Sequence, residues 1–172
     1  IALEQRNFGE CGGSENGPNC LESSMTALLM GRTTIGERVW DISRLIDVLH
    51  SQFGDVVDVN TICCMGNSGG GTAAYYAACM EERIKIAMPS CSVCTFDQSI
   101  GIMRHCTCNY IPRMAKYLDM GEIACMIAPR KLVVVAGEED NGFYIAGSRR
   151  AYSTIEKIYK KQIHATTAKY PK

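Results

Sequence analysis

The chain has 172 residues, 47% of them hydrophobic, and its 18 basic and 18 acidic side chains give a formal net charge of zero. Length and composition predict one globular domain over residues 1–172 with a substantial core. The balanced charge argues against a nucleic-acid-binding surface or a polybasic membrane patch, and no apolar run approaches the ~20 residues that span a bilayer. We therefore expect neither nucleic acid nor membrane as a partner.

The first part of the chain predicts two strands and two helices. Residues 1–5 and 59–66 are apolar enough for strands, and 8–19 form a loop rich in Gly, Asn and Ser. Helices are expected over 20–31, ended by Gly31, and over 36–53. The second helix has one apolar face, formed by Val39, Ile42, Leu45, Ile46 and Leu49 and widened by Trp40 and Val48.

The rest of the chain continues this alternation. Residues 71–81 predict a helix of small side chains, 84–90 a strand, and 91–109 an irregular segment. Short helices follow over 111–118 and 120–128, then the clearest strand over 131–137, a loop over 138–144, a helix over 146–161 and the start of a last strand at 166. The pattern predicts an α/β fold, a mostly parallel sheet with helices on both faces. Its strands, 59–66 included, are expected to be covered on both sides.

The stretch Gly66-Asn67-Ser68-Gly69-Gly70 fits G-x-S-x-G and lies between a predicted strand and a predicted helix, the context of a nucleophile elbow. Glycines beside the serine permit the sharp turn. Ser68 would then stand at a helix N-terminus, where the Gly69 amide can donate to an oxyanion. We predict Ser68 as a nucleophile. A glycine-rich turn with an incidental serine is the simpler alternative, and no Gly-Lys-Ser/Thr follows to suggest a phosphate loop.

A nucleophilic serine needs a base and an orienting carboxylate, here in the chain order serine, acid, histidine. The loop after the strand 131–137 supplies Glu138, Glu139 and Asp140. Asp140 lies furthest past the strand, so we predict it as the acid, facing Ser68 across the carboxyl ends of the strands while both glutamates point elsewhere. A solvated acidic loop is the alternative interpretation.

The three histidines do not supply an obvious base. His50 precedes the serine, and His105 lies between the serine and the acid. His164 is the one histidine after Asp140, but it directly follows a predicted helix, which favours a helix-end residue over a base. We keep His164 as a doubtful fallback only, and expect His105 to make a structural hydrogen bond in its loop, with a role near the site as the alternative.

Ten cysteines are present, several of them in apolar runs where cysteine behaves as a small hydrophobe. We expect free thiols in a reducing cytoplasm rather than disulfides. A zinc site formed by Cys91, Cys94, Cys106 and Cys108 is the alternative, but the spacings do not match the common zinc patterns. We therefore expect no metal and no cofactor.

At this point the sequence resembles a known family. It is similar to the acetyl xylan esterase-like branch of the α/β-hydrolases, close to the dienelactone hydrolase type. Five segments carry the resemblance: QRNFGEC, LLMGRTTIGERVWDISRLIDVL, GNSGGGTAAYYAA, the run from HCTCNYIP to GEEDNGF, and RRAYSTIEKIYK. They cover nearly the whole chain, and together they are far more specific than G-x-S-x-G.

The resemblance implies Ser68 as nucleophile and Asp140 as acid, and it gives His105 no role in the triad. It also implies a Gly-Gly-His after a further strand, and strands before residue 1 that carry the second oxyanion donor. Neither is found in this sequence, so we expect the middle portion of an α/β-hydrolase domain, incomplete at both ends. One strand that would separate residues 1–5 from 61–65 is also missing. We therefore expect residues 1–5 to be displaced, or self-association to cover the exposed edge.

Three functions follow as hypotheses. The first is a serine carboxylic-ester hydrolase that acts through an acyl-enzyme on Ser68, with small acyl esters and, by resemblance, acetylated sugars as substrates. This chain would be poorly active without its histidine. The second is a non-catalytic α/β-hydrolase module that acts by binding, and Asp41 is expected to be structural in either case. The third is a thiol-rich metal or redox protein.

Overall fold

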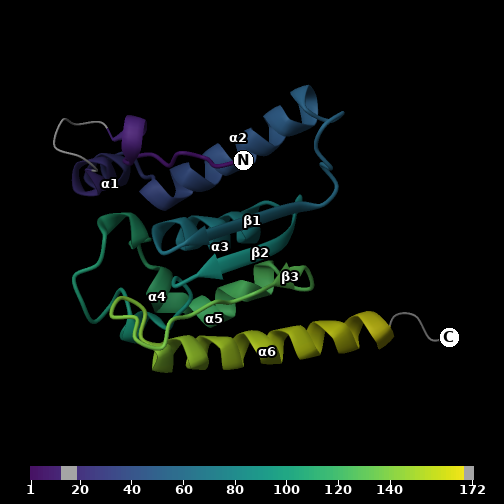
Figure 1. The fold of residues 1–172 in the computed structure, drawn as a ribbon. Helices are drawn as coiled ribbons and strands as arrows, with labels where there is room; N and C mark the ends of the chain where they lie inside the picture. The colour runs from purple at the N-terminus through teal and green to yellow at the C-terminus, as the bar shows by residue number, and fades with distance from the viewer. Residues whose placement is uncertain (13–18, 169–172) are drawn as a thin grey trace.

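The computed structural model describes residues 1–12 and 19–168, and of residues 163–168 it describes the backbone only (Figure 1). In this part of the chain three parallel strands form the sheet: β1 (Ile62–Asn67), β2 (Ile84–Ser90) and β3 (Lys131–Leu132), in the order β1-β2-β3. An isolated bridge between Ser90 and Val135 continues the third strand. The predicted α/β class with a parallel sheet is confirmed.

Six α-helices and four 3-10 helices accompany the sheet among the described residues. The α-helices are α1 (Cys20–Leu29), α2 (Thr34–Gln52), α3 (Gly69–Met80), α4 (Met114–Tyr117), α5 (Met120–Ile123) and α6 (Ile145–Ala168). The 3-10 helices are η1 (Gly9–Cys11), η2 (Phe96–Gln98), η3 (Thr107–Asn109) and η4 (Ala124–Met126). Among these helices, none is both long and apolar enough to cross a membrane.

Local sequence signals set the helix ends. Asn19 caps α1 by accepting a hydrogen bond from the Glu22 amide at 3.1 Å, and Thr33 caps α2 in the same way through the Gly36 amide. Just after α1, Gly31 takes a φ of 71°, a conformation that favours glycine. The prediction that Gly31 ends this helix is therefore confirmed.

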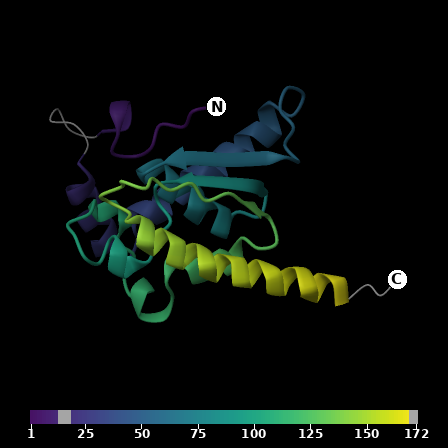
Figure 2. The same cartoon turned by 60° about the horizontal axis from the view of Figure 1, so that its bottom comes forward.

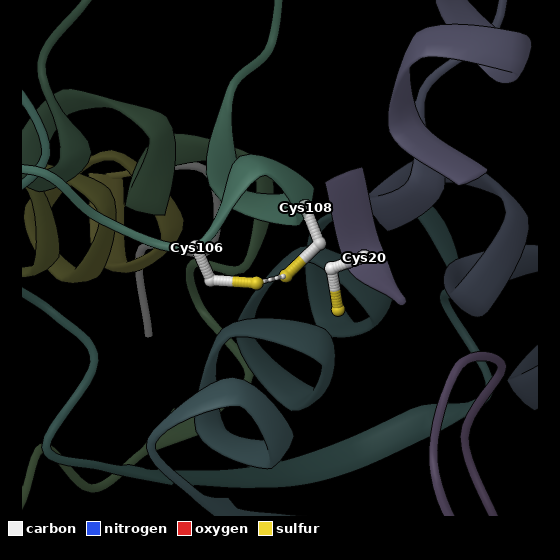
Figure 3. Close-up of side chains that lie close together, drawn as sticks. All are labelled: Cys20, Cys106 and Cys108. Carbon is white, nitrogen blue, oxygen red and sulfur yellow. Dashed lines mark hydrogen bonds between the residues drawn. The ribbon is translucent and has the colours of Figure 1, made fainter. Parts of the chain in front are cut away.

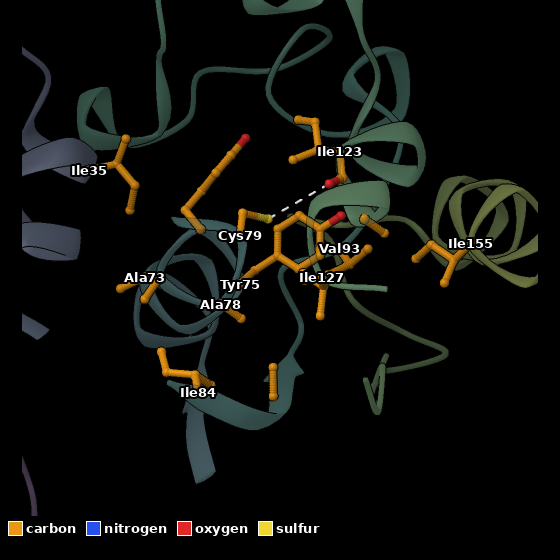
Figure 4. Close-up of a cluster of buried hydrophobic side chains, with 14 of the residues drawn as sticks. Ile35, Ala73, Tyr75, Ala78, Cys79, Ile84, Val93, Ile123, Ile127 and Ile155 are labelled. Carbon is orange, nitrogen blue, oxygen red and sulfur yellow. Dashed lines mark hydrogen bonds between the residues drawn. The ribbon is translucent and has the colours of Figure 1, made fainter. Parts of the chain in front are cut away.

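The core lies on one face of the sheet, between the strands and helices α2, α3 and α6 (Figure 4). Alternate residues of the strands, including Ile62 and Cys64, contact it, while α3 presents almost exclusively buried small side chains and two tyrosines. Figure 2 shows α6 running along this helical layer. Within the described residues the other face of the sheet is exposed at Cys63, Met65, Val133 and Val135. The expectation that 59–66 is covered on both sides is wrong for this part of the chain.

Arg130 ties the end of α3 to the segment before β3. Its guanidinium donates to the carbonyls of Ala78, Glu81, Ile84 and Met126 at 2.6–3.0 Å. The hydroxyl of Tyr159 on α6 donates to the Arg130 carbonyl at 2.6 Å. One side chain thus satisfies several main-chain acceptors that a helix end and a turn leave unpaired.

Residues 1–5 are not a strand. They lie beside α2 and the outer edge of β1, with a hollow between that Leu3, Gln5 and Met65 help to line (Figure 1). Arg6 holds the segment there by pairing with Asp41 of α2 at 2.5 and 2.7 Å. Because a ladder requires strands about 4.8 Å apart, this anchor on α2 keeps the segment off the sheet, and it shows the structural role expected of Asp41.

Two further sequence predictions are corrected. Trp40 and Val48 do not widen the buried face of α2: Trp40 is 58% exposed and stacks with the guanidinium of Arg44 instead. The strand predicted from residue 166 is wrong for 166–168, which continue α6, because no glycine or proline stops that helix before Pro171. Residues 169 and 170 lie outside the described residues.

Candidate functional site

Ser68 lies at the tight turn between β1 and α3. It is the N-cap of α3 with φ 52° and ψ −117°, backbone angles that residues with a Cβ rarely adopt. Its amide donates to the Ser90 carbonyl of β2 at 2.8 Å, which fixes the turn against the neighbouring strand. The side chain is exposed. A strained, exposed serine between the end of β1 and the start of α3 has the geometry of a nucleophile elbow.

The glycines around the serine are required by close contact. A Cβ on Gly66 would lie 2.3 Å from the carbonyl carbon and oxygen of Gly70, so the strand and the first turn of α3 touch through their backbones. A Cβ on Gly71 would lie 2.4 Å from the Ser92 hydroxyl. At Gly69, in contrast, nothing lies within 4 Å of such an atom. The space beside Gly69 is therefore open, as a binding position next to Ser68 requires.

The Gly69 amide, which the sequence suggested as an oxyanion donor, lies beside Ser68 at the N-terminus of α3. Gly69 is the first residue of α3, so its N–H has no acceptor within the helix and the helix dipole adds positive potential there. An oxygen that gains negative charge beside Ser68 would be stabilised by this amide.

Asp140 follows the third strand at the same edge of the sheet as Ser68. Ser90 pairs with both Asn67 and Val135, and the Cys91 amide donates to the Val135 carbonyl at 2.8 Å, so the three strands end side by side. The carboxylate of Asp140 accepts hydrogen bonds from the amides of Gly142 and Phe143 at 2.8 and 3.0 Å. These bonds fix the carboxylate within its loop.

The neighbouring glutamates are solvated. The side chain of Glu138 is 83% exposed and meets Arg149 at 3.7 Å, and Glu139 is also exposed. Within the acidic loop, Asp140 is thus the carboxylate that the local main chain orients.

His105 lies close to Asp140. Its ring contacts the ring of Phe143 edge to face at 4.9 Å between centroids, and its Nδ1 lies 3.0 Å from the side-chain amide nitrogen of Asn109. Burial lowers the pKa of His105, although a hydrogen bond with the Gly142 main chain and the charge of Asp140 act in the opposite direction. His105 makes the structural contacts expected of it, and they support the loop that carries Asp140.

The other two histidines, His50 and His164, lie on helices at positions far from this edge of the sheet, and only the backbone of His164 is described. His50 is exposed near the end of α2. His164 lies in α6, which begins beside the Asp140 loop and runs away from it (Figures 1 and 2). At 1.5 Å per residue, the His164 backbone is about 28 Å along the axis from Ile145. Among the side chains described (1–12 and 19–162), no histidine bonds to the Ser68 hydroxyl.

Sequence reasoning did not place Cys91 or Gln5 beside this site, and it considered Cys91 only as an alternative zinc ligand. Cys91 directly follows β2, has φ 49°, and lines an open hollow together with residues 137–140. The side chain of Gln5 reaches α3: its Nε2 lies 3.3 Å from where a Cβ of Gly70 would be, and its Oε1 is buried without a partner among the described residues. No sequence pattern predicts that either residue lies beside Ser68 or Asp140, because each acquires its position from long-range packing.

All ten cysteines are free, as expected. The cysteine quartet considered for zinc is not brought together: Cys106 and Cys108 lie beside Cys20 of α1, in a group that includes neither Cys91 nor Cys94. Cys94 is instead buried in a second small core cluster with Met120 and Phe143.

The chain is similar to a family of esterases and to a protein named as a hydrolase. A family model described as glucuronyl esterase of fungi matches residues 31–107. The protein YtaP of Bacillus subtilis (strain 168), named as a hydrolase, is 26% identical over 165 residues, which cover 94% of this chain and 53% of YtaP.

Solved glucuronoyl esterases share the fold. The carbohydrate esterase family 15 enzyme of Caldicellulosiruptor kristjansonii has a TM-score of 0.62 at 18% identity, and the catalytic domain from Hypocrea jecorina has 0.61 at 21%. A mutant of the Sporotrichum thermophile enzyme, in complex with methyl 4-O-methyl-β-D-glucopyranuronate, has 0.63 at 18%. Each match covers 75% of this chain and 42% of the solved one. The chain thus spans about half the length of the relatives it matches.

Proposed function

We propose, from the α/β-hydrolase fold that this chain shares with known esterases, that it is a serine carboxylic-ester hydrolase with Ser68 as the nucleophile. One observation carries the proposal: an exposed serine with φ 52° is held at the turn between the parallel strand β1 and helix α3. Such strain is maintained where function requires it. Asp140 is the proposed acid and the Gly69 amide the proposed oxyanion donor.

The reaction would use these groups together with an imidazole base, which no described histidine side chain supplies at Ser68. The Ser68 Oγ attacks the ester carbonyl carbon, its proton passes to an imidazole base, and the alcohol leaves with a proton returned by that base. The carbonyl oxygen, negatively charged in the tetrahedral intermediate, accepts a hydrogen bond from Gly69. Water then releases the acid from the acyl-enzyme, and Ser68 is regenerated. No step in this sequence needs a metal or an organic cofactor.

The proposed substrates are small esters of sugars. The family model that matches residues 31–107 and the solved relatives are glucuronoyl esterases, one of them in complex with a methyl glucuronate ester. The resemblance to acetyl xylan esterases suggests acetylated sugars as well. The two classes differ in which side of the ester bond carries the sugar, so turnover of a methyl glucuronate and of an acetylated xylose distinguishes them.

The test is covalent labelling of the chain with a fluorophosphonate probe, with and without added imidazole. Because no described histidine bonds to Ser68, we expect slow labelling that imidazole accelerates. Peptide mapping by mass spectrometry should place the probe on Ser68. Ser68→Ala should abolish labelling, while Ser153→Ala, at an exposed position on α6, should leave it unchanged. Label on another serine, or none even with imidazole, contradicts the proposal.

Turnover provides the second measurement. Removing one triad member costs on the order of 10⁴-fold in rate when the triad is complete. We expect Ser68→Ala to remove all imidazole-stimulated hydrolysis of an activated ester above the rate in solution, and Asp140→Asn to reduce it. Equal turnover by the Ser68→Ala variant would assign the activity to another group.

A second candidate is a non-catalytic module that binds sugar esters. The observation that favours it is that no described histidine side chain meets Ser68. Calorimetric binding of a methyl glucuronate, combined with no Ser68-dependent turnover under any imidazole concentration, would select this function over catalysis.

Two features bear on where and how the chain acts. The outer edge of β1 has no strand partner among the described residues, and an unpaired edge favours pairing with another chain. We therefore propose self-association through β1, to be checked by sedimentation with Met65→Lys as the disrupting variant.

The ten free cysteines are consistent with a reducing, cytoplasmic location, which cell fractionation tests.

A further inference from the structure

Three cysteine thiols converge at a point distant in sequence from the serine elbow. Cys20 is the first residue of α1 (Figure 3). Cys106 directly precedes η3, and Cys108 is the middle residue of η3. Their three sulfur atoms all lie within 4.8 Å of one another, and the Cys106 and Cys108 sulfurs are 3.1 Å apart. Figure 3 shows the Cys106 and Cys108 sulfurs facing each other, with the Cys20 side chain of α1 beside them. We refer to these three residues as the thiol cluster.

A buried cation faces the thiol cluster without an acid to balance it. Arg38 of α2 is 1% exposed and forms no salt bridge within the described residues. One guanidinium nitrogen donates to the Arg6 carbonyl at 2.9 Å and lies 3.7 Å from the Cys20 sulfur, and the other two nitrogens are buried without a partner among the described residues. Burying a charged group in this way is costly unless an opposite charge lies near it.

The thiol cluster can supply that charge. A metal ion removes the proton from each thiol that coordinates it. Three cysteine ligands would therefore place negative charge beside the Arg38 guanidinium, which lies 3.7 Å from the Cys20 sulfur. The N-terminus of α1 at Cys20 adds positive potential.

From this geometry we infer that Cys20, Cys106 and Cys108 form a three-thiolate site for a soft metal ion, with Zn²⁺ as the expected occupant and Arg38 as its buried counter-charge. Three thiolates and one Zn²⁺ carry a single net negative charge, which the guanidinium neutralises. Zinc–sulfur bonds of about 2.3 Å place tetrahedral sulfur ligands about 3.8 Å apart. The present separations, of which one is 3.1 Å and none exceeds 4.8 Å, lie close to that value.

The fourth position of this site faces solvent. Cys106 is exposed, Cys20 is partly buried and Cys108 is buried, so the metal can enter from the Cys106 side and retain a water ligand there. The ion would join α1 to the segment around η3, two elements that are in contact. Neither the cysteine quartet considered from the sequence nor the proposed esterase reaction contains this site.

The test uses the whole chain, reduced and stripped of metal. Zinc binding is measured by competition with a chromogenic chelator, and Co²⁺ substitution reports thiolate ligation through its charge-transfer absorption. We expect one equivalent of zinc and a rise in melting temperature that a chelator reverses. Cys106→Ser and Cys108→Ser should each weaken binding by more than about 100-fold, and Arg38→Met by about 10- to 100-fold. Cys125→Ser, an exposed thiol outside the cluster, should bind as the parent does.

Other outcomes overturn the inference. Circular dichroism of each variant without metal establishes that it is folded, so that lost binding reports lost ligands. No zinc uptake by the reduced protein, or unchanged uptake by folded Cys106→Ser, rules out the site. A disulfide between two members of the thiol cluster under mild oxidation, with no zinc uptake after reduction, would make it a redox pair instead.

Discussion

Replacing Ser68 with glycine should stabilise the protein, whereas replacing it with alanine should not. Ser68 has φ 52° and ψ −117°, a conformation that costs a residue with a Cβ on the order of 1–3 kcal/mol. Glycine removes this strain but loses ~0.4–1 kcal/mol through the greater freedom of the unfolded chain. The net gain is roughly 0.5–2 kcal/mol. Alanine keeps the Cβ and therefore the strain.

Urea denaturation followed by circular dichroism measures the difference directly. For a chain of this size the expected gain raises the melting temperature by about 1–8 °C, while the alanine variant should stay within about 0.5 kcal/mol of the parent. Because the Ser68 hydroxyl has no hydrogen bond among the described side chains, its removal adds no separate cost. If Ser68→Gly unfolds at the same or lower urea concentration than Ser68→Ala, the turn is not strained and this account of the elbow is wrong.

Three further results are expected. Gly71→Ala should lose about 1–3 kcal/mol of stability, because its Cβ would lie 2.4 Å from a serine hydroxyl. Gly69→Ala has open space around it and should change stability by less than about 0.5 kcal/mol. Equal losses of the two variants in thermal melts would contradict the packing at the elbow. Arg130→Met should cost at least about 2 kcal/mol, since four main-chain carbonyls lose a charged donor, and an unchanged urea midpoint would show that water replaces it. The hydrogen bond from Arg83 holds the pKa of Glu81 at about 2, despite some burial. The Glu81 carboxylate therefore contributes fully to the free energy of unfolding above pH about 4.5, and this contribution disappears as the pH falls to about 2. A Glu81→Gln variant that kept the parent's full loss of stability over this range would refute the assignment.

The elbow was predictable from sequence because its determinants are local. Strand, turn and helix lie within some twenty residues, and the contact between Gly66 and Gly70 arises from their spacing. The Asp140 loop was placed correctly at the carboxyl edge because parallel strands end together. The catalytic roles of these residues stay predictions until the labelling experiment is done.

The errors concern contacts between distant segments. Residues 1–5 begin with an apolar run that predicts a strand, but Arg6 fixes the segment to Asp41 on α2. Likewise, Cys106 meets Cys20 rather than Cys91, because the packing of α1 against η3 decides which thiols come together. Arg38, a buried charge in an otherwise amphipathic helix, gives no sequence signal that distinguishes it from the solvated arginines around it.

Two adjacent cysteines on β1 lie on opposite faces of the sheet, so their reactivities report whether each face is covered. Cys63 is exposed, whereas Cys64 points into the core, and burial, with a smaller effect of Cys63, raises the pKa of the Cys64 thiol to about 11. An alkylating reagent at neutral pH should therefore modify Cys63 much faster than its neighbour, although the two differ only in the direction of a pleat. A protein segment that covers the open face of the sheet would slow the alkylation of Cys63 toward the rate of Cys64. The ratio of the two alkylation rates, measured by mass spectrometry, would therefore report whether that face is covered.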